Sequence, residues 1–416
     1  MSVKSRTRRP VARHGQLHRP SAWTQLLKII GIAVTVVLVS GVSVAAYVVY
    51  DLSTDFTEGA VVLAGQDDVP PDIGDLKGGV NMLLVGSDEC EEGYEASFGD
   101  RCTEDDGGAR NDVNMLLHIS DEPRRVTVIT FPRDLMVEVP DCTDADGGTV
   151  SGAWSAQINT VYERGGLGCV VDTVAELSGQ EIQFAAKITW DGVIQITNAI
   201  GGVDVCIATR LEDEYYTGLV LEPGMHSLAG WDALQFLRTR HGVGDGSDLA
   251  RVSNQQVYMS SLARKLVSEE VLTNVGTLLR LAKVTLSNVT PSQSLTNPML
   301  LAQIAMAVKN VPFEDINFLQ YPVFDDPDNV GRVIPDYASA DQLWAVLAAN
   351  ESMQVTGGTD AVTADGAEIP AATAEPTPED GETVDAATPT PTGPVGLPSN
   401  IKGQSAATQS CANGAG

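Results

Sequence analysis

The chain has 416 residues, 43% of them hydrophobic, and its 26 basic side chains are outnumbered by 55 acidic ones, which gives a formal net charge of −29 at pH 7. A chain of this length can bury one large core or two modest ones. Its acidic body repels nucleic acid, which argues against a role in binding DNA or RNA.

The N-terminal part differs in charge from the rest of the chain. Residues 1–28 contain basic side chains and no acidic one, and residues 29–50 contain no charge. The uncharged segment is long enough to cross a bilayer as a helix. Its apolar run continues past the small residues that resemble a cleavage site, so we expect a retained anchor and not a cleaved signal peptide. The basic flank then predicts a cytoplasmic N-terminus, with the rest of this single-pass protein outside the cell membrane.

The remaining chain divides by composition. Residues 51–77 are polar and contain Pro70-Pro71, which predicts a stalk. Short apolar runs bounded by turn residues predict buried strands. Together with later helices they predict one α/β domain at 78–350, a single α-β-α domain with a central mixed sheet. Residues 351–416 are rich in Ala, Thr, Pro and acids and are expected to be a disordered acidic tail. The expected strands are 80–85, 113–119, 126–131, 203–207 and 316–323, and the expected helices are about 167–177, 191–199, 229–240, 248–267 and 338–349.

The six cysteines lack the close pairs of a zinc site. An oxidising compartment favours disulfides. Cys90 and Cys102 flank a polar loop and are the easiest pair to join, and Cys142 with Cys169 is the next. Cys206 also fits a buried position in a strand, and the sequence alone does not give the connectivity.

Arginines gather around a glycine-rich turn between Arg238 and Gln256. Guanidinium groups suit phosphate oxygens, so this cluster in an acidic protein indicates an anion site. Arg251 and Gln255 share one face near the start of the predicted helix at Asp248. An arginine there opposes the helix dipole unless the helix start binds phosphate. Capping by Asp248 with Ser247 is an equal alternative, and Arg238 or Arg240 alone fits a solvated charge.

Three more charged residues stand at predicted strand ends. Asp88 follows the first strand and Asp112 precedes the second. Such carboxylates can share Mg²⁺, with phosphate oxygens completing its coordination. Arg133 lies just beyond the third strand, where ligands of α/β folds gather. Turn or capping roles for the aspartates and a surface position for the arginine are the alternatives.

These fragments form an ordered set. Over about residues 78–267 the chain resembles the LytR-CpsA-Psr family of membrane-anchored cell-wall glycopolymer ligases, and its acidic body and cysteines are typical of an actinobacterial member. The motifs that carry the resemblance are LLVGSD (83–88), RNDVNMLL (110–117), FPRD (131–134), INT (158–160), IGGVDV (200–205), LAGWDALQFLRTR (228–240), DLAR (248–251) and QQ (255–256).

The resemblance implies a reaction and a set of site residues. The expected reaction is transfer of a glycan-1-phosphate from a polyprenyl-pyrophosphate-linked glycan donor to a peptidoglycan acceptor. Asp88 and Asp112 are implied as ligands of Mg²⁺, or of Mn²⁺ in its place. The implied pyrophosphate ligands are Arg133, Arg238, Arg240, Arg251 and Gln255, and the implied catalytic set is Arg133, Arg238, Arg240, Asp248 and Arg251. Phosphoryl transfer needs mainly positioning and charge neutralisation, which these groups supply.

Some positions depart from the family pattern. Asn254 stands where an arginine is usual, so one phosphate contact is expected to be lost. Asn111 and Val113 replace the usual Ser and Thr beside Asp112, which weakens the expected support of the metal. Two other functions remain open: a polyprenyl-pyrophosphate phosphatase, and a non-catalytic envelope regulator or sensor.

Overall fold

The computed structural model describes residues 57, 60–63, 79–89, 109–144, 147–267, 275–359, 361–363 and 393–415. All of them belong to the compact unit Leu52–Gly416. The predicted basic segment and anchor, most of the predicted stalk, and the Cys90 and Cys102 pair lie outside the described residues. Within the described ranges, no helix combines the length and apolar character that a membrane crossing requires.

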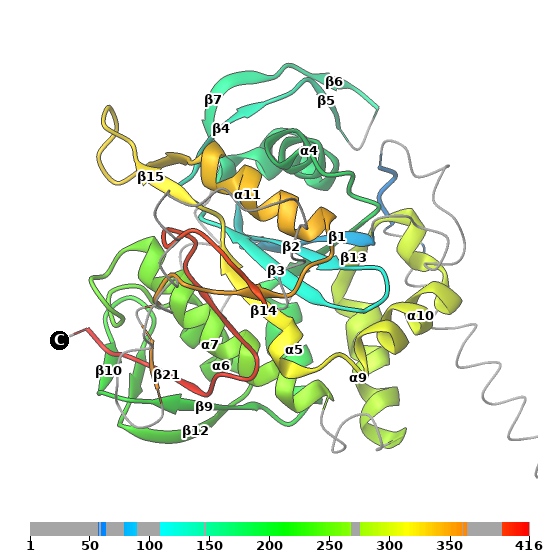
Figure 1. Ribbon diagram of the computed structural model, residues 1–416. Helices are drawn as coiled ribbons and strands as arrows, with labels where there is room; N and C mark the ends of the chain where they lie inside the picture. Colours follow the sequence, from blue (N-terminus) through cyan, green and yellow to red (C-terminus); the bar gives the residue numbers. More distant parts are fainter. Residues whose placement is uncertain are drawn as a thin grey trace, which may run out of the picture. The chain divides into compact units, whose positions relative to one another are not determined.

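A seven-stranded mixed sheet forms the centre of the domain (Figure 1). β1 pairs in parallel with β8, and β3 with β14, whereas β2 lies antiparallel between β1 and β3. The strands β1, β3, β8 and β14 therefore all end at one edge, and the predicted central mixed sheet is confirmed. The order across the sheet is β13 (Val289–Pro291), β8 (Phe184–Thr189), β1 (Val80–Ser87), β2 (Asn111–Ile119), β3 (Val126–Phe131), β14 (Ile316–Gln320) and β20 (Gly403–Ser405).

Helices cover both faces of this sheet. Because successive side chains of a strand point to opposite faces, β1 places Leu83 in one core and Met82 in another. The Leu83 core includes residues of α4 (Val161–Ser178) and α11 (Tyr337–Ala348), and the Met82 core includes residues of α10 (Pro298–Val308). Figure 1 shows α4 and α11 together on one side of the sheet and α7 (Asp248–Val267) on the other. Burial on both faces explains why these strands are apolar throughout.

A four-stranded sheet packs beside α7 around a third core. Its strands lie in the order β12 (Gly224–Leu228), β9 (Val203–Ile207), β21 (Ser410–Ala412) and β18 (Val362–Thr363). The helices α5 (Trp190–Ala199), α6 (Gly230–Arg238) and α9 (Val275–Asn288) complete the helical layer. Two-stranded pairs join β4 (Met136–Val139) to β7 (Ala153–Gln157), β5 (Cys142–Thr143) to β6 (Thr149–Val150), β10 (Leu211–Asp213) to β11 (Leu219–Leu221), β15 (Val323–Asp325) to β16 (Val333–Pro335), and β17 (Met353–Gln354) to β19 (Val395–Gly396).

The prediction of a disordered tail at 351–416 is wrong for its C-terminal part. Residues 403–415, called here the C-terminal segment, add β20 to the central sheet beside β14 and β21 to the smaller sheet beside β9. Ala406 and Ala412 are at most 2% exposed. The segment has no apolar periodicity of its own that would predict these strands. Hydrogen bonds to strands distant in sequence and a disulfide hold it in place instead.

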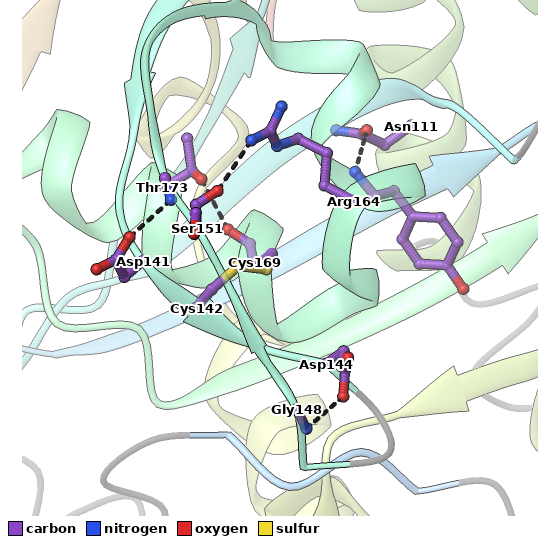
Figure 2. The surroundings of a disulfide bond; sticks show 11 residues. Asn111, Asp141, Cys142, Asp144, Gly148, Ser151, Arg164, Cys169 and Thr173 are labelled. Carbon is purple, nitrogen blue, oxygen red and sulfur yellow. Dashed lines mark hydrogen bonds between the residues drawn. A yellow bond between two sulfur atoms is a disulfide. The ribbon is translucent and has the colours of Figure 1, made fainter.

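Two disulfides link distant elements. Cys206 in β9 bonds to Cys411 in β21, and Cys142 in β5 bonds to Cys169 in α4. Figure 2 shows the second bond, with Arg164 of α4 donating a hydrogen bond to the Ser151 carbonyl of the β6–β7 turn at 2.9 Å. A Cβ at Gly165 would lie 2.1 Å from Cys169 Sγ, so this bond requires glycine there. The Cys142–Cys169 expectation is thus met, and Cys206 is paired as well as being part of a strand.

Candidate functional site

The candidate site lies at the edge where the parallel strands of the central sheet end. Asp88 follows β1, and Arg133 follows β3. Asp112 is the second residue of β2 and does not precede this strand as the sequence predicted. Loops at this edge are ordered by the motif asparagine Asn111, whose Nδ2 donates to the Ile158 carbonyl at 2.9 Å and whose Oδ1 accepts from the Tyr162 amide. The sheet therefore gathers side chains from segments far apart in the sequence.

Four predicted residues form one charged group, called here the arginine–aspartate cluster: Asp112, Arg133, Asp248 and Arg251. Arg133 Nη1 lies 2.9 Å from Asp112 Oδ1, and Arg251 Nη2 lies 2.7 Å from Asp248 Oδ1. Arg133 Nε lies 3.7 Å from Asp248 Oδ1, and Arg251 Nη2 also donates to the Asp112 carbonyl oxygen at 3.1 Å. The side chains of Asp248 and Arg251 are only 7% and 5% exposed, so the cluster is largely shielded from water.

At the start of α7, one residue caps the helix and another neutralises the charge of Arg251. Ser247 Oγ accepts a hydrogen bond from the Ala250 amide at 3.2 Å, which is the capping interaction. Asp248 instead pairs with Arg251 and Arg133. Of the two residues proposed to cap this helix, Ser247 does so, and Asp248 is part of the charged group.

Arg240 lies in the electric field of the same group. Burial lowers the pKa of its guanidinium, and the positive charges of Arg133 and Arg251 lower it further, against the opposing effect of Asp248 and Asp134. Burial also lowers the pKa of Arg133, but the carboxylates of Asp112, Asp248 and Asp134 together raise it above its ordinary value. Three arginines from three segments thus share one small region, and an anion bound among them would relieve their mutual repulsion.

Arg238 and Gln255 are engaged in structural contacts beside this group. The Arg238 guanidinium lies 3.8 Å from the ring centre of Trp190, at the start of α5. Gln255 Nε2 donates to the Leu237 carbonyl at 3.0 Å, which ties α7 to the end of α6. Arg238 Nη1 also donates to Gln235 Oε1 at 3.1 Å within α6, so these contacts of Arg238 and Gln255 support α6 and α7.

Asn254 points away from the cluster. Its Nδ2 donates to the Phe236 carbonyl at 2.8 Å, and it lies with Ala412 and Asn413 of the C-terminal segment around a small cavity. The expectation that its missing charge removes a phosphate contact therefore does not match its position here. A side chain four residues from Ala250 and three from Val257 faces the smaller sheet, not the strand edge.

The predicted metal ligands differ in their contacts. Asp88 Oδ1 accepts from the Arg110 amide at 2.6 Å, and Asp112 Oδ1 accepts from Arg133 and, at 3.4 Å, from Asn159. No cluster of three or more potential metal-ligating side chains occurs within the residues that the structure describes. Two carboxylates nevertheless match the donor set of Mg²⁺, which takes one or two of them together with phosphate oxygens and water.

Two residues of this region were not predicted as site residues. Asp134 Oδ1 accepts from Arg332 Nη1 at 2.7 Å and from Gln157 Nε2. Burial raises the pKa of the Asp134 carboxyl, and the nearby Asp248 carboxylate adds to this, against three neighbouring arginines. Asp134 was visible in the FPRD motif, but nothing in the sequence near Arg332 connects it to residues almost two hundred positions earlier.

Comparison with known proteins bears on these residues. The model of the LytR_cpsA_psr family matches residues 47–349, which is well over half of the chain. The chain belongs to the LytR_cpsA_psr family. All eight predicted site residues fall inside the matched range.

The relatives are moderately similar to this chain in sequence. The chain is 27% identical over 270 residues to cell wall biosynthesis protein LcpA of Corynebacterium glutamicum, and the match covers 59% of this chain and 50% of LcpA. It is 25% identical over 243 residues to the polyisoprenyl-teichoic acid–peptidoglycan teichoic acid transferase TagT of Bacillus subtilis, covering 56% of this chain and 68% of TagT. The matches span only 50% and 61% of the two Corynebacterium glutamicum relatives. Among solved structures, a LytR-Csp2A-Psr enzyme from Actinomyces oris matches with a TM-score of 0.49 and 23% identity, over 64% of this chain and 89% of that chain.

Proposed function

We propose that this chain is a phosphotransferase that moves a glycan-1-phosphate from a polyprenyl-pyrophosphate carrier to peptidoglycan during cell-wall assembly. The observation that carries the proposal is the convergence of Arg133, Arg240 and Arg251 with Asp112 and Asp248 in one shielded group. Family membership supports it, as do the names of relatives that describe cell wall biosynthesis and teichoic acid transfer to peptidoglycan.

The reaction exchanges one phosphorus–oxygen bond for another. A hydroxyl oxygen of a peptidoglycan sugar attacks the phosphorus nearer the glycan and forms the new ester bond. The bond from that phosphorus to the bridging oxygen breaks, and polyprenyl phosphate leaves with the bonding electrons. The hydroxyl proton passes to a carboxylate or to water. Because the transition state carries much negative charge, the reaction is accelerated mainly by positioned cations.

The arginines have separable tasks in this proposal. Arg251 and Arg133 hold the two phosphate groups, and Asp248 between them fixes both guanidinium planes. Arg240 approaches the same anion from the loop before α7, where its repulsion from Arg133 and Arg251 favours binding of negative charge. Arg238 stacks on Trp190 and supports the end of α6 beside them.

A divalent cation completes the proposed site. Asp88 and Asp112 would hold Mg²⁺, or Mn²⁺, at the ends of neighbouring strands, since their carboxylates suit a hard cation. When bound, the ion would neutralise charge on the pyrophosphate oxygens. Loading the ion would compete with the present Asp112–Arg133 ion pair and so leave Arg133 available to the substrate.

The cellular setting is also part of the proposal. We place the domain outside the cell membrane behind a retained N-terminal anchor, with no nucleic acid among its partners. The two disulfides are consistent with this setting, because such bonds persist in oxidising compartments. The strongly acidic composition argues in the same direction against nucleic acid.

The decisive experiment incubates the purified full chain in detergent with Mg²⁺, a polyprenyl-pyrophosphate-linked glycan and peptidoglycan oligomers. We expect glycan to become covalently attached to peptidoglycan, and chelation of the cation to suppress this. Release of free glycan phosphate without attachment would replace the proposal by the phosphatase function. Lipid binding without any turnover would favour the sensor function.

A further inference from the structure

A polar cleft borders the arginine–aspartate cluster on the side of the β15–β16 hairpin. Its volume is about 280 Å³, close to the lower end of the range for small-ligand pockets, about 300 Å³. We call it the hairpin cleft, and its polar side chains are Asp134, Arg240, Ser247, Asp248, Asp325 and Arg332. Asp248 belongs to both the cleft and the cluster, so a molecule in the cleft would lie next to the bound phosphate.

The cleft is built on fixed backbone. The Val333 amide donates to the Asp134 carbonyl at 3.2 Å, which fastens β16 to the loop after β3. Arg332 Nη1 pairs with Asp134 Oδ1 at 2.7 Å, and the Asp326 amide donates to the Arg332 carbonyl at 2.9 Å. These contacts hold Asp134 and Arg332 in place before any ligand binds, as a specific binding site requires.

The lining selects for a ligand that both donates and accepts hydrogen bonds. Carboxylates of Asp134, Asp248 and Asp325 accept, whereas the guanidinium groups of Arg240 and Arg332 donate. A second phosphate would be repelled by the three carboxylates, and a lipid chain would leave the lining without hydrogen bonds. A sugar ring carries hydroxyls that do both, and a single ring suits a cleft of this size.

We infer that the hairpin cleft is a sugar subsite, and that Arg332 and Asp325 position one ring of a glycan substrate beside the phosphorus that is transferred. The role of the sugar in the transfer reaction rests on the proposed function, whereas its binding in the cleft does not. The ring belongs either to the peptidoglycan acceptor or to the donor glycan, which present the same chemistry to the cleft.

Direct binding separates these two sources without turnover. The full chain in detergent is titrated by ligand-observed NMR with a soluble peptidoglycan disaccharide and, separately, with the donor glycan lacking phosphate and lipid. We expect Arg332→Ala and Asp325→Asn to weaken one of them about tenfold or more, since hydrogen bonds to charged groups are lost. Arg210→Ala is the matched control, because that arginine also forms carboxylate ion pairs and is about half exposed, but lies outside the cleft.

Each result has a defined meaning. Weakened disaccharide binding assigns the cleft to the acceptor, and weakened binding of the free donor glycan assigns it to the donor. Unchanged binding of both sugars in Arg332→Ala and Asp325→Asn, or their failure to bind wild type, would overturn the subsite. Asp325→Asn alters an exposed side chain and so keeps the test valid if Arg332→Ala is unstable. Sugar binding with no transfer by wild type would instead reject the proposed function while leaving the subsite in place.

Discussion

Arg251 combines two properties that rarely occur together, a full positive charge and near-complete burial in the first turn of a helix. Its side chain is 5% exposed, and its compensation comes from Asp248 at 2.7 Å. Asp248 is shared with Arg133, which also pairs with Asp112 at 2.9 Å, so the charges of the four-residue cluster balance. Arg251 nevertheless stands in the first turn of α7, where the helix dipole favours a bound anion.

We expect Arg251→Ala to lower the rate of glycan transfer at least about tenfold, because removal of one charge-stabilising donor commonly costs that much or more. The measurement is the initial rate at saturating donor, with the melting temperature followed in parallel. Arg125→Ala is a suitable control, because Arg125 is also largely buried and ion-paired. It precedes β3 and therefore lies at the opposite end of that strand from Arg133 and the cluster. Equal rates in wild type and Arg251→Ala would remove this residue from the mechanism.

The buried side chain of His118 is expected to make the stability of the fold sensitive to acid. Burial lowers its pKa from 6.5 to about 4, more than the attraction of Asp121 raises it. Between these values the unfolded chain binds a proton that the folded chain does not, so stability is complete above about pH 6.5 and falls as the pH drops toward 4. The loss is about 3 kcal/mol.

Urea unfolding at pH 7 and pH 4.5 measures this effect. His118→Gln should show a smaller loss of stability between the two pH values than wild type. His226→Gln, at a less buried histidine whose Nε2 contacts the Glu222 carbonyl, should retain the wild-type dependence. A pH dependence identical in wild type and His118→Gln would assign the acid sensitivity to other groups.

The sequence predicted a gathering of charged residues better than it predicted their contacts. The family resemblance implied that Asp112, Arg133, Asp248 and Arg251 belong to one site, and the structure brings the four together. The contact of Gln255 with the Leu237 carbonyl could not be predicted. From the sequence alone, this glutamine could reach either a bound phosphate or the preceding helix. Arg332 depends on a hairpin that returns to Asp134, and no local pattern encodes that return.

Among the elements, the C-terminal segment contacts the loop that leads into α7. Val243 and Gly414 form a β-bridge, and the Ala415 amide donates to the Gly242 carbonyl at 2.9 Å. A Cβ at Gly414 would lie 2.0 Å from the Arg210 carbonyl oxygen, so the two backbones are in close contact. The segment thereby holds the loop that connects Arg240 to Asp248.

Breaking the Cys206–Cys411 bond should therefore affect both stability and activity. The bond closes a loop with a sequence separation of 205, and we expect the Cys206→Ser, Cys411→Ser double variant to lose about 2–4 kcal/mol of stability. Because the glycine-rich loop also loosens, the KM for donor should rise.

The Cys142→Ser, Cys169→Ser variant is the matched control. It removes a disulfide of sequence separation 27 between a hairpin and α4, away from that loop. Its stability should fall while its KM for donor stays near that of wild type. A similar rise in KM in both double variants would mean that the effect reports general loosening and not the loop.

These elements also show where sequence patterns stop being informative. The helix predicted at 248–267 is observed as Asp248–Val267, a segment of 20 residues with no Gly or Pro inside it to interrupt the helix. The strands β20 and β21 have three residues each, too few for any period, and they follow a Thr- and Pro-rich stretch. Their formation depends on the edges of β14 and β9, which only the folded molecule presents.

At the scale of the whole molecule, the family match ends at residue 349, yet the fold continues beyond it. Leu397 and Ile401 are 3% and 0% exposed in the core beneath α11. Burial of two such side chains stabilises the domain by about 3–6 kcal/mol. Residues after the matched range are therefore part of the folded domain and not an appendage to it.

A chain ended after Asn350 should be less stable and prone to associate. It lacks Leu397, Ile401 and both C-terminal strands, and it leaves the edge of β14 unpaired. We expect a melting temperature several degrees lower and a higher-mass fraction in size-exclusion chromatography. An unchanged melting temperature with a single monodisperse peak would show that the shortened domain is autonomous.

The position of the C-terminal segment also sets an order of events during synthesis. Arg240, Asp248 and Arg251 leave the ribosome long before residues 403–415. Until the C-terminal segment emerges, β9 and the loop between Arg240 and Asp248 lack their last neighbours. The Cys206 thiol must wait unpaired for Cys411 through the translation of all intervening residues. In a nascent chain the loop between Arg240 and Asp248 is therefore held in its final position only after residues 403–415 have been synthesised and Cys411 has been oxidised.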